Sequence, residues 1–192
     1  RAKQQASAEL RRETLVHSAA ALAEASAAMC DRFVRGGRLF VFGNGGSSTD
    51  AASLVSLFLQ PPWGEPLPAR NLVEDSAVLT ALGNDVGFDL VFSRQLIAHA
   101  GANDVAIGLS TSGNSRNLLN AFAEASSHGL LTIGIAGYSG GEMAASSHVR
   151  HCLVVNADSV HRIQESQAAL GFELWRAVQT RLSEVSNTKA AR

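Results

Sequence analysis

The sequence has only two cysteines in 192 residues, and this scarcity excludes several classes of protein. Cys30 and Cys152 lie far apart and form no Cys-x-x-Cys spacing, so neither a disulfide framework nor a cysteine metal site is indicated. Reduced cysteines in a core are typical of the cytoplasm, where thiols are kept reduced. We therefore expect a cytoplasmic protein.

Long apolar runs, long basic runs and metal-binding histidine patterns are also missing. No stretch approaches the roughly 18–20 apolar residues of a membrane span, and the first residues, Arg1–Gln5, carry no apolar core of a signal peptide. The formal net charge is −1, which does not favour direct binding of nucleic acid. The six histidines show neither His-x-x-x-His nor His-Glu-x-x-His spacing. We expect no membrane or nucleic-acid partner, and nothing in these patterns indicates a metal.

What is present is the composition and patterning of a folded α/β domain. Apolar residues make up 46% of the chain, and its length suits one domain, 1–192, with an N-terminal helical segment 4–35, an α/β core 36–185 and a polar, frayed tail 186–192. Strand and helix patterns alternate, which predicts a doubly wound, mostly parallel sheet with helices on both faces. The expected helices cover 4–35, 48–59, 75–83, 88–99, 115–127 and 159–185, with a short one ending near 146, and the expected strands cover 38–42, 70–73, 104–109, 130–135 and 151–155.

Two turns between a strand and a helix are rich in glycine and hydroxyl groups. The second, Ser110–Ser115, holds four hydroxyls and Gly113, and the first, Gly43–Thr49, has a similar arrangement. Unpaired N–H groups and the helix dipole make a helix start a site for anions, which hydroxyl groups can complete. The alternative for Ser110–Ser115 is an ordinary polar helix cap. Two such turns at the carboxyl ends of parallel strands predict a phosphorylated small molecule as ligand.

Other motifs fit poorly. The turn at Gly43 has Ser48 where a dinucleotide fingerprint needs its third glycine, and no lysine follows in P-loop spacing. The segment Gly108–Gly113 differs by one residue from the spacing of a nucleophile elbow. His161, beside Gln164 and Glu165, is the one histidine we place near a site, with an exposed first-turn residue as the alternative. Asp85 either caps a helix or contacts a ligand hydroxyl.

Five segments together resemble the sugar isomerase (SIS) domain family, in its phosphoheptose isomerase branch, which also contains a protein that binds the bacterial replication initiator. They are Gly43–Ser47, Gly83–Arg94, Ser110–Ser115, Gly137–Met143 and Arg162–Glu165, within about 5–185. The resemblance implies a homotetramer with the N-terminal helix in the oligomer core and active sites between subunits. It also implies a sugar-phosphate ligand, contacted by Asn44, Gly45, Ser47, Asn84, Asp85, Ser110, Thr111, Ser112, Ser115 and Gln164.

The catalytic residues of the family do not carry over. The resemblance implies a glutamate base at position 57, a histidine acid at position 172 and a further zinc-binding histidine at position 53, where this chain has Leu57, Phe172 and Ser53. An aspartate of the family falls at His161, and Gln164 alone remains of the zinc set. Losing one positioned acid or base costs roughly 10²–10⁴-fold in rate. We therefore expect no zinc cofactor.

Three functions follow as hypotheses. The main expectation is a binding protein for sugar phosphates, regulatory or adaptor in role, with a protein partner like that of the initiator-binding relative. One alternative is an active sedoheptulose 7-phosphate isomerase in which His161, Glu165 or Asp85 transfers the proton. The other is a non-catalytic subunit of a mixed oligomer.

Overall fold

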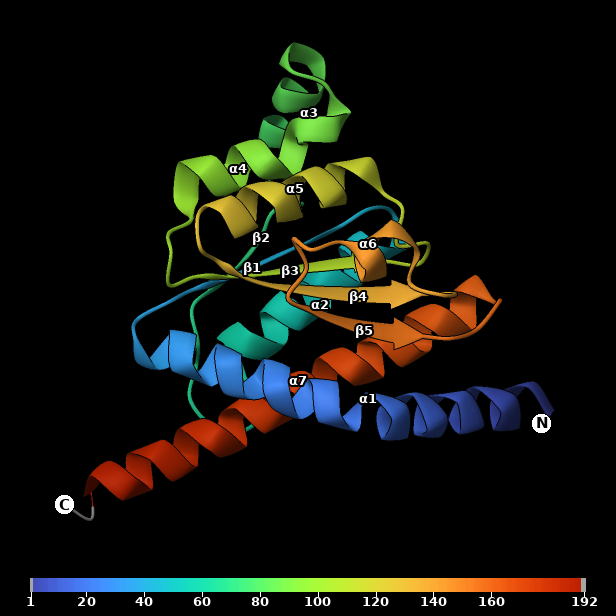
Figure 1. Cartoon of the computed structure of the whole chain (residues 1–192), viewed down its shortest axis with the longest axis vertical. Helices are drawn as coiled ribbons and strands as arrows, with labels where there is room; N and C mark the ends of the chain where they lie inside the picture. Colours follow the sequence, from blue (N-terminus) through green and yellow to red (C-terminus); the bar gives the residue numbers. More distant parts are fainter. Residues whose placement is uncertain (1, 191–192) are drawn as a thin grey trace.

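Five short segments form one parallel sheet in the computed structural model, which describes residues 2–190 (Figure 1). The spatial order is β2-β1-β3-β4-β5. The strands are β1 Leu39–Gly43, β2 Ala69–Asn71, β3 Val105–Ser110, β4 Leu131–Gly137 and β5 His151–Val155. All residues of β1, β3 and β4 are buried, as central parallel strands with both faces covered should be.

Helices cover both faces of this sheet, which confirms the doubly wound α/β class (Figure 1). On one face lie α1 Ala2–Val34, α2 Gly46–Leu59 and α7 Val160–Ala190, around a core that includes the fully buried Trp175. On the other lie α4 Val91–His99 and α5 Arg116–Ser127. Beyond them, away from the sheet, stands α3 Ser76–Asp85, which contacts α4 and the short 3₁₀ helix η1 Phe88–Leu90. The small helix α6 Gly141–Ala145 contacts β4 and β5. Phe42, with ring centroids 5.3 Å from Phe92 and 5.4 Å from Phe122, centres the second core.

The expected frayed tail is wrong over most of its length, because α7 continues through Ser186 to Ala190. No glycine or proline follows Gly171, so nothing in this stretch ends the helix. The hydroxyl of Thr188 donates to the carbonyl of Glu184 at 2.9 Å, within the helix. Residues 191 and 192 lie outside the described part of the chain. None of the described helices is long and apolar enough to cross a membrane.

The proline-rich loop 60–68 is tied to α7 by one buried side chain, Gln179. The backbone N–H of Glu65 donates to Gln179 Oε1 at 3.0 Å, and Gln179 Nε2 donates to the carbonyl of Glu65 at 2.8 Å. The same loop places the ring of Trp63 with its centroid 5.0 Å from that of Trp175. An irregular segment is thereby held in one position against the helix.

Replacing Gln179 by alanine is expected to destabilise the protein. The change removes both bonds to Glu65 and leaves backbone groups without partners, at a cost of roughly 1–3 kcal/mol in the free energy of unfolding. Urea unfolding followed by circular dichroism measures this, with Thr180→Ala on the exposed side of the same turn as the control. Equal unfolding midpoints for the two variants would show that the loop needs no such anchor.

Candidate functional site

The hydroxyl groups of the Ser110–Ser115 turn gather around one point at the carboxyl end of β3. Ser110 Oγ lies 3.2 Å from Ser115 Oγ and 3.5 Å from Ser112 Oγ. The backbone N–H of Gly113 donates to Ser110 Oγ at 3.1 Å. Gly113 has a φ of 68°, and a side chain there would collide with the carbonyl of Gly140. The turn is therefore built to bring three serine hydroxyls together.

Ser115 distinguishes this arrangement from an ordinary helix cap. It occupies the N-cap position of α5, yet its side chain makes no capping hydrogen bond to the helix. Its hydroxyl is directed to Ser110 instead. The first N–H groups of α5 thus keep their partial positive charge beside a group of hydroxyls, which suits a phosphate.

The first glycine-rich turn is joined to the second by a pair of amides. Asn44 Nδ2 donates to Asn117 Oδ1 at 2.9 Å, and Asn117 Nδ2 donates to Asn44 Oδ1 at the same distance. On its other side the turn meets α7, since a side chain at Gly46 would collide with the amide of Gln164. Asn44, Gly45, Ser47 and Gln164 thus lie at the sheet edge that carries the serine turn, and their roles in ligand binding stay predictions.

A cavity of about 240 Å³ lies between α2 and α7, beside the serine turn. Two lining residues connect the cavity to the serine turn. Leu109 directly precedes Ser110 in the chain, and Gln167 Nε2 donates to the carbonyl of Ser110 at 3.2 Å. The lining residues are Asp50, Ser53, Leu54, Leu57, Leu109, Gln167, Ala168, Gly171 and Phe172. A phosphate on the serines would therefore place the rest of a small molecule near this largely apolar cavity.

Asp50 is the single ionisable side chain that lines this cavity. Its Oδ2 is buried and has no hydrogen-bond partner among the described residues. Burial in these surroundings raises the pKa of the Asp50 carboxyl, because the charged form loses its hydration. A carboxyl with a raised pKa in a cavity is a candidate for acid–base chemistry.

Asp50 is not among the acid–base candidates of the sequence analysis, although the sequence contains a signal for it. Asp50, Leu54 and Leu57 are spaced i, i+4 and i+7, which places them on one face of α2. Since that face packs toward α7, a carboxylate within it must be removed from water. The sequence pattern points to His161, Glu165 and Asp85 as acid–base candidates instead.

Those three residues are all exposed. His161 and Glu165 lie in the first turns of α7, and Asp85 ends α3, where its Oδ1 accepts a 2.9 Å hydrogen bond from Asn84 Nδ2. No hydrogen bond or ion pair between described side chains joins them to the serine turn. The roles of Asn84, Asp85, His161 and Glu165 stay predictions.

The donor set required for the family's zinc is not assembled. Leu57 and Phe172 offer no ligand atom, and the hydroxyl of Ser53 is engaged with the carbonyl of Thr49 at 3.0 Å. Over residues 2–190 no three histidine, cysteine, aspartate or glutamate side chains cluster in a way that could hold a metal ion. The residues present therefore do not fit zinc, and no step of the chemistry below is routed through it.

Comparison with known proteins gives a consistent result. Residues 4–137 match the family model described as SIS domain. The phosphoheptose isomerase of Solidesulfovibrio magneticus is 42% identical over 165 residues, covering 83% of this chain and 78% of that protein. The one of a Roseiflexus species is 36% identical over 184 residues, covering 94% and 91%. The structure of a phosphoheptose isomerase from Francisella tularensis superposes with a TM-score of 0.87 at 31% identity, covering 93% and 95%.

Proposed function

We propose that this chain, which belongs to the SIS domain family and is closely related to its phosphoheptose isomerases, is itself an aldose–ketose isomerase of sugar phosphates. The substrate that its relatives suggest is sedoheptulose 7-phosphate. The observation that carries the proposal is the half-buried Asp50, whose Oδ2 is buried without a partner among the described residues, in a cavity that adjoins the serine turn. We further propose that residues 1–192 act as one domain.

The main expectation from the sequence, a binding protein without isomerase activity, is wrong. Relatives that are 42%, 44% and 36% identical over 83%, 74% and 94% of this chain are phosphoheptose isomerases. The expectation assumed that proton transfer requires side chains at positions 57 and 172. It did not consider Asp50, whose carboxyl shares the cavity with Leu57 and Phe172.

The reaction requires one proton to move between adjacent carbons and another to move between their oxygens. The Asp50 carboxylate takes the proton from one carbon, which leaves an enediolate. The hydroxyl proton then passes between the two oxygens, and the Asp50 carboxyl returns its proton to the neighbouring carbon. A raised pKa brings this carboxyl nearer to the operating pH, where a group both accepts and releases protons readily. Leu54, Leu57, Leu109 and Phe172 form apolar walls beside the carboxyl.

Gln167 links the cavity to the strand that carries the serine turn. Its Nε2 donates to the carbonyls of Ser110 and Ile135, at 3.2 Å and 3.1 Å, which fixes the amide. Its Oε1 is buried and has no partner among the described residues. Because Gln167 is fully buried, we assign it the positioning of the serine turn and not a contact with the sugar.

The pH dependence of turnover should report Asp50. Because burial raises its pKa and the base acts in its ionised form, the rate should fall on the acid side with a midpoint above the usual aspartate value of about 3.9. A profile of kcat from about pH 4 to about pH 9, with circular dichroism at each pH, measures this. A midpoint at or below the usual value would exclude Asp50 as the base.

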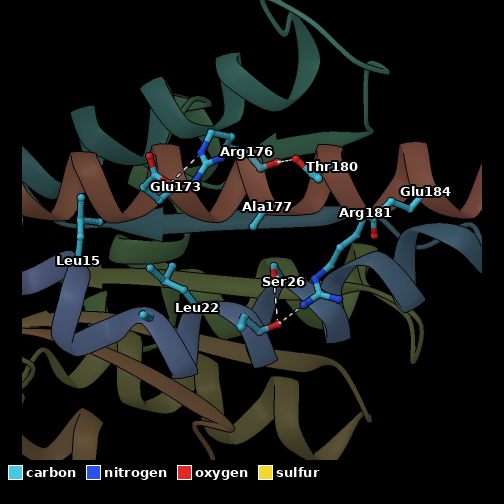
Figure 2. Close-up of a pocket in the computed structure, with 11 residues that line it drawn as sticks. Leu15, Leu22, Ser26, Glu173, Arg176, Ala177, Thr180, Arg181 and Glu184 are labelled. Atoms are coloured by element: carbon cyan, nitrogen blue, oxygen red, sulfur yellow. Dashed lines mark hydrogen bonds and ion pairs between the residues drawn. The ribbon is translucent and has the colours of Figure 1, made fainter.

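The homotetramer with α1 in its core remains a proposal. It is supported by a groove of about 520 Å³ between α1 and α7, with Leu15 and Leu22 along one side and Arg176 paired with Glu173 on the other (Figure 2). Val16 is 64% exposed on the same helix, which a second copy would cover. Sedimentation equilibrium would give the tetramer mass, whereas a monomer at micromolar concentration would refute this part.

The cytoplasmic location also remains a proposal. Both cysteines are free, and burial raises the pKa of the Cys152 thiol to about 11, so it stays protonated and unreactive at neutral pH. Such thiols are typical of a reducing compartment.

The proposed activity is tested by incubating the pure protein with sedoheptulose 7-phosphate, with and without zinc, and assaying the aldose heptose phosphate. We expect conversion well above a buffer blank. A rate no higher than the blank, with thermal stabilisation by the sugar phosphate, would show that the protein binds the ligand without converting it. That result would refute the proposal.

A further inference from the structure

Another cavity, of about 820 Å³, opens at the amino ends of the strands, opposite the end that carries the serine turn. It is formed by the C-terminal half of α1, the end of α5 at Ser126, and the first residues of β4 and β5. The proposed isomerase site lies at the carboxyl ends of the strands, whereas this cavity lies at their amino ends. No step of the isomerase reaction uses it.

The polar lining of this cavity carries more positive than negative charge. Arg32 and Arg35 come from α1, and Arg150 comes from the residue before β5. Facing them are two carboxylates, Glu24 and Asp31. None of the three guanidinium groups has an ion-pair partner within 4.0 Å in the part of the chain that the structure describes. An anion would supply that partner.

The fold holds the guanidinium of Arg32 and the backbone of Arg150 in place. Arg32 donates from one guanidinium nitrogen to the carbonyls of Ala102 and Gly129, the latter at 3.2 Å, which leaves its other nitrogens free. The backbone N–H of Arg150 donates to Thr132 Oγ1 at 2.9 Å, which ties the start of β5 to β4. The backbone frame of the cavity is therefore set by the fold, while the exposed side chains of Arg35 and Arg150 are ordered when an anion binds.

His151 gives the cavity a further polar group that no protein partner satisfies. Its side chain is only 11% exposed, and its Nδ1 lies 3.9 Å from Glu24 Oε2, too far for a hydrogen bond. Burial, with Arg150 nearby, lowers the pKa of the imidazole, so the ring is neutral at pH 7. A neutral imidazole can donate or accept a hydrogen bond with a heterocycle.

The remaining lining is mixed, with the polar Ser126, Thr132 and Ser147 beside a small apolar surface. Ala27 and Ala28 come from α1, and Leu130 and Leu131 come from the start of β4. A flat ring can pack on such a surface, while phosphate groups reach the arginines. The volume lies within the range of about 300–1,000 Å³ that is usual for small-molecule sites.

We propose that this cavity is an effector site for a nucleotide, with the phosphates on Arg35 and Arg150 and the base on the alanine and leucine surface beside His151. The site is separate from the proposed isomerase site, and its existence does not depend on whether the chain is an isomerase. Inorganic phosphate and adenosine each match only one part of the cavity.

Isothermal titration with ADP tests the proposal. We expect one saturable site per chain, and at least tenfold weaker binding of adenosine and of inorganic pyrophosphate. The Arg35→Ala/Arg150→Ala variant should lose tenfold or more in ADP affinity, because it removes both guanidinium groups proposed to contact the phosphates. The matched control is Arg11→Ala/Arg70→Ala, which removes two exposed arginines that lie outside the cavity and should bind ADP normally.

A third variant separates this cavity from the serine turn, which could also hold a phosphate. Ser112→Ala/Ser115→Ala should leave ADP binding unchanged. The proposal is overturned by absence of saturable ADP binding, by pyrophosphate binding as tightly as ADP, or by ADP affinity that depends on the serines and not on the arginines.

Discussion

Replacing Asp50 by asparagine is expected to lower kcat by roughly 10²–10⁴-fold, the usual cost of removing a positioned acid–base group. Asparagine keeps the shape of the side chain but cannot carry a proton between carbons. The binding of sugar phosphate should change little, because the phosphate contacts that we propose lie on the serine turn rather than on α2. A fall in kcat with a nearly constant KM, measured by steady-state kinetics, is therefore the expected pattern.

The same variant should be more stable than the parent protein at pH 7. The folded-state pKa of Asp50 is raised by burial, so the stability associated with this group is present below its unfolded pKa and is lost as the pH rises through the folded pKa. Asparagine cannot ionise, so the variant does not lose this stability as the pH rises. Its midpoint of thermal unfolding should therefore be higher than that of the parent protein at pH 7 but not at pH 3. Glu74→Gln makes the same chemical change at an exposed position and should alter neither rate nor stability. An active Asp50→Asn enzyme would require another base.

Removing two hydroxyls from the serine turn is the other change with a large expected effect. In the Ser112→Ala/Ser115→Ala variant, a bound phosphate would lose two hydrogen bonds from hydroxyl groups. Each hydrogen bond to a charged group contributes about 1.5–3 kcal/mol. Affinity for sedoheptulose 7-phosphate should fall by roughly 10²-fold or more, since about 1.4 kcal/mol corresponds to tenfold. KM should rise accordingly, with a smaller change in kcat.

The fold of this variant should be retained, because Ser115 makes no capping bond to α5. Ser127→Ala, at the other end of α5, removes a hydroxyl that bonds only within the helix and near His128, and serves as the control. If the serine-turn variant kept its affinity, the phosphate would have to bind elsewhere.

Much of the fold could be predicted because its signals are local. The continuous apolar run of Val105–Leu109 marks a buried strand, and the hydroxyl-rich turn that follows it marks the start of a helix. The two glycine-rich turns could be placed at one sheet edge because parallel strands end on the same side. The resemblance to the SIS domain family, carried by residues such as Ser110–Ser115, was confirmed by the family match.

The proton-transfer group could not be found in the same way, because its surroundings come from distant parts of the chain. Asp50 becomes a perturbed carboxyl only when α7 covers the face of α2 on which it lies. Gln167 is likewise a polar residue within a helix until its amide is seen fixed between the carbonyls of Ser110 and Ile135. The sequence predicts that the last helix ends at 185, whereas α7 ends at Ala190, because a polar stretch without a helix-ending residue gives no signal for the boundary.

The central claim is that Asp50 moves a proton on the carbon of a bound sugar phosphate. Proton NMR of sedoheptulose 7-phosphate in deuterium oxide tests it most directly, because each enediol formed exchanges a C1 proton with solvent. The account predicts progressive loss of the C1 proton signal with the parent protein and no loss above the buffer blank with Asp50→Asn. No exchange with the parent protein, or equal exchange with both, would contradict it.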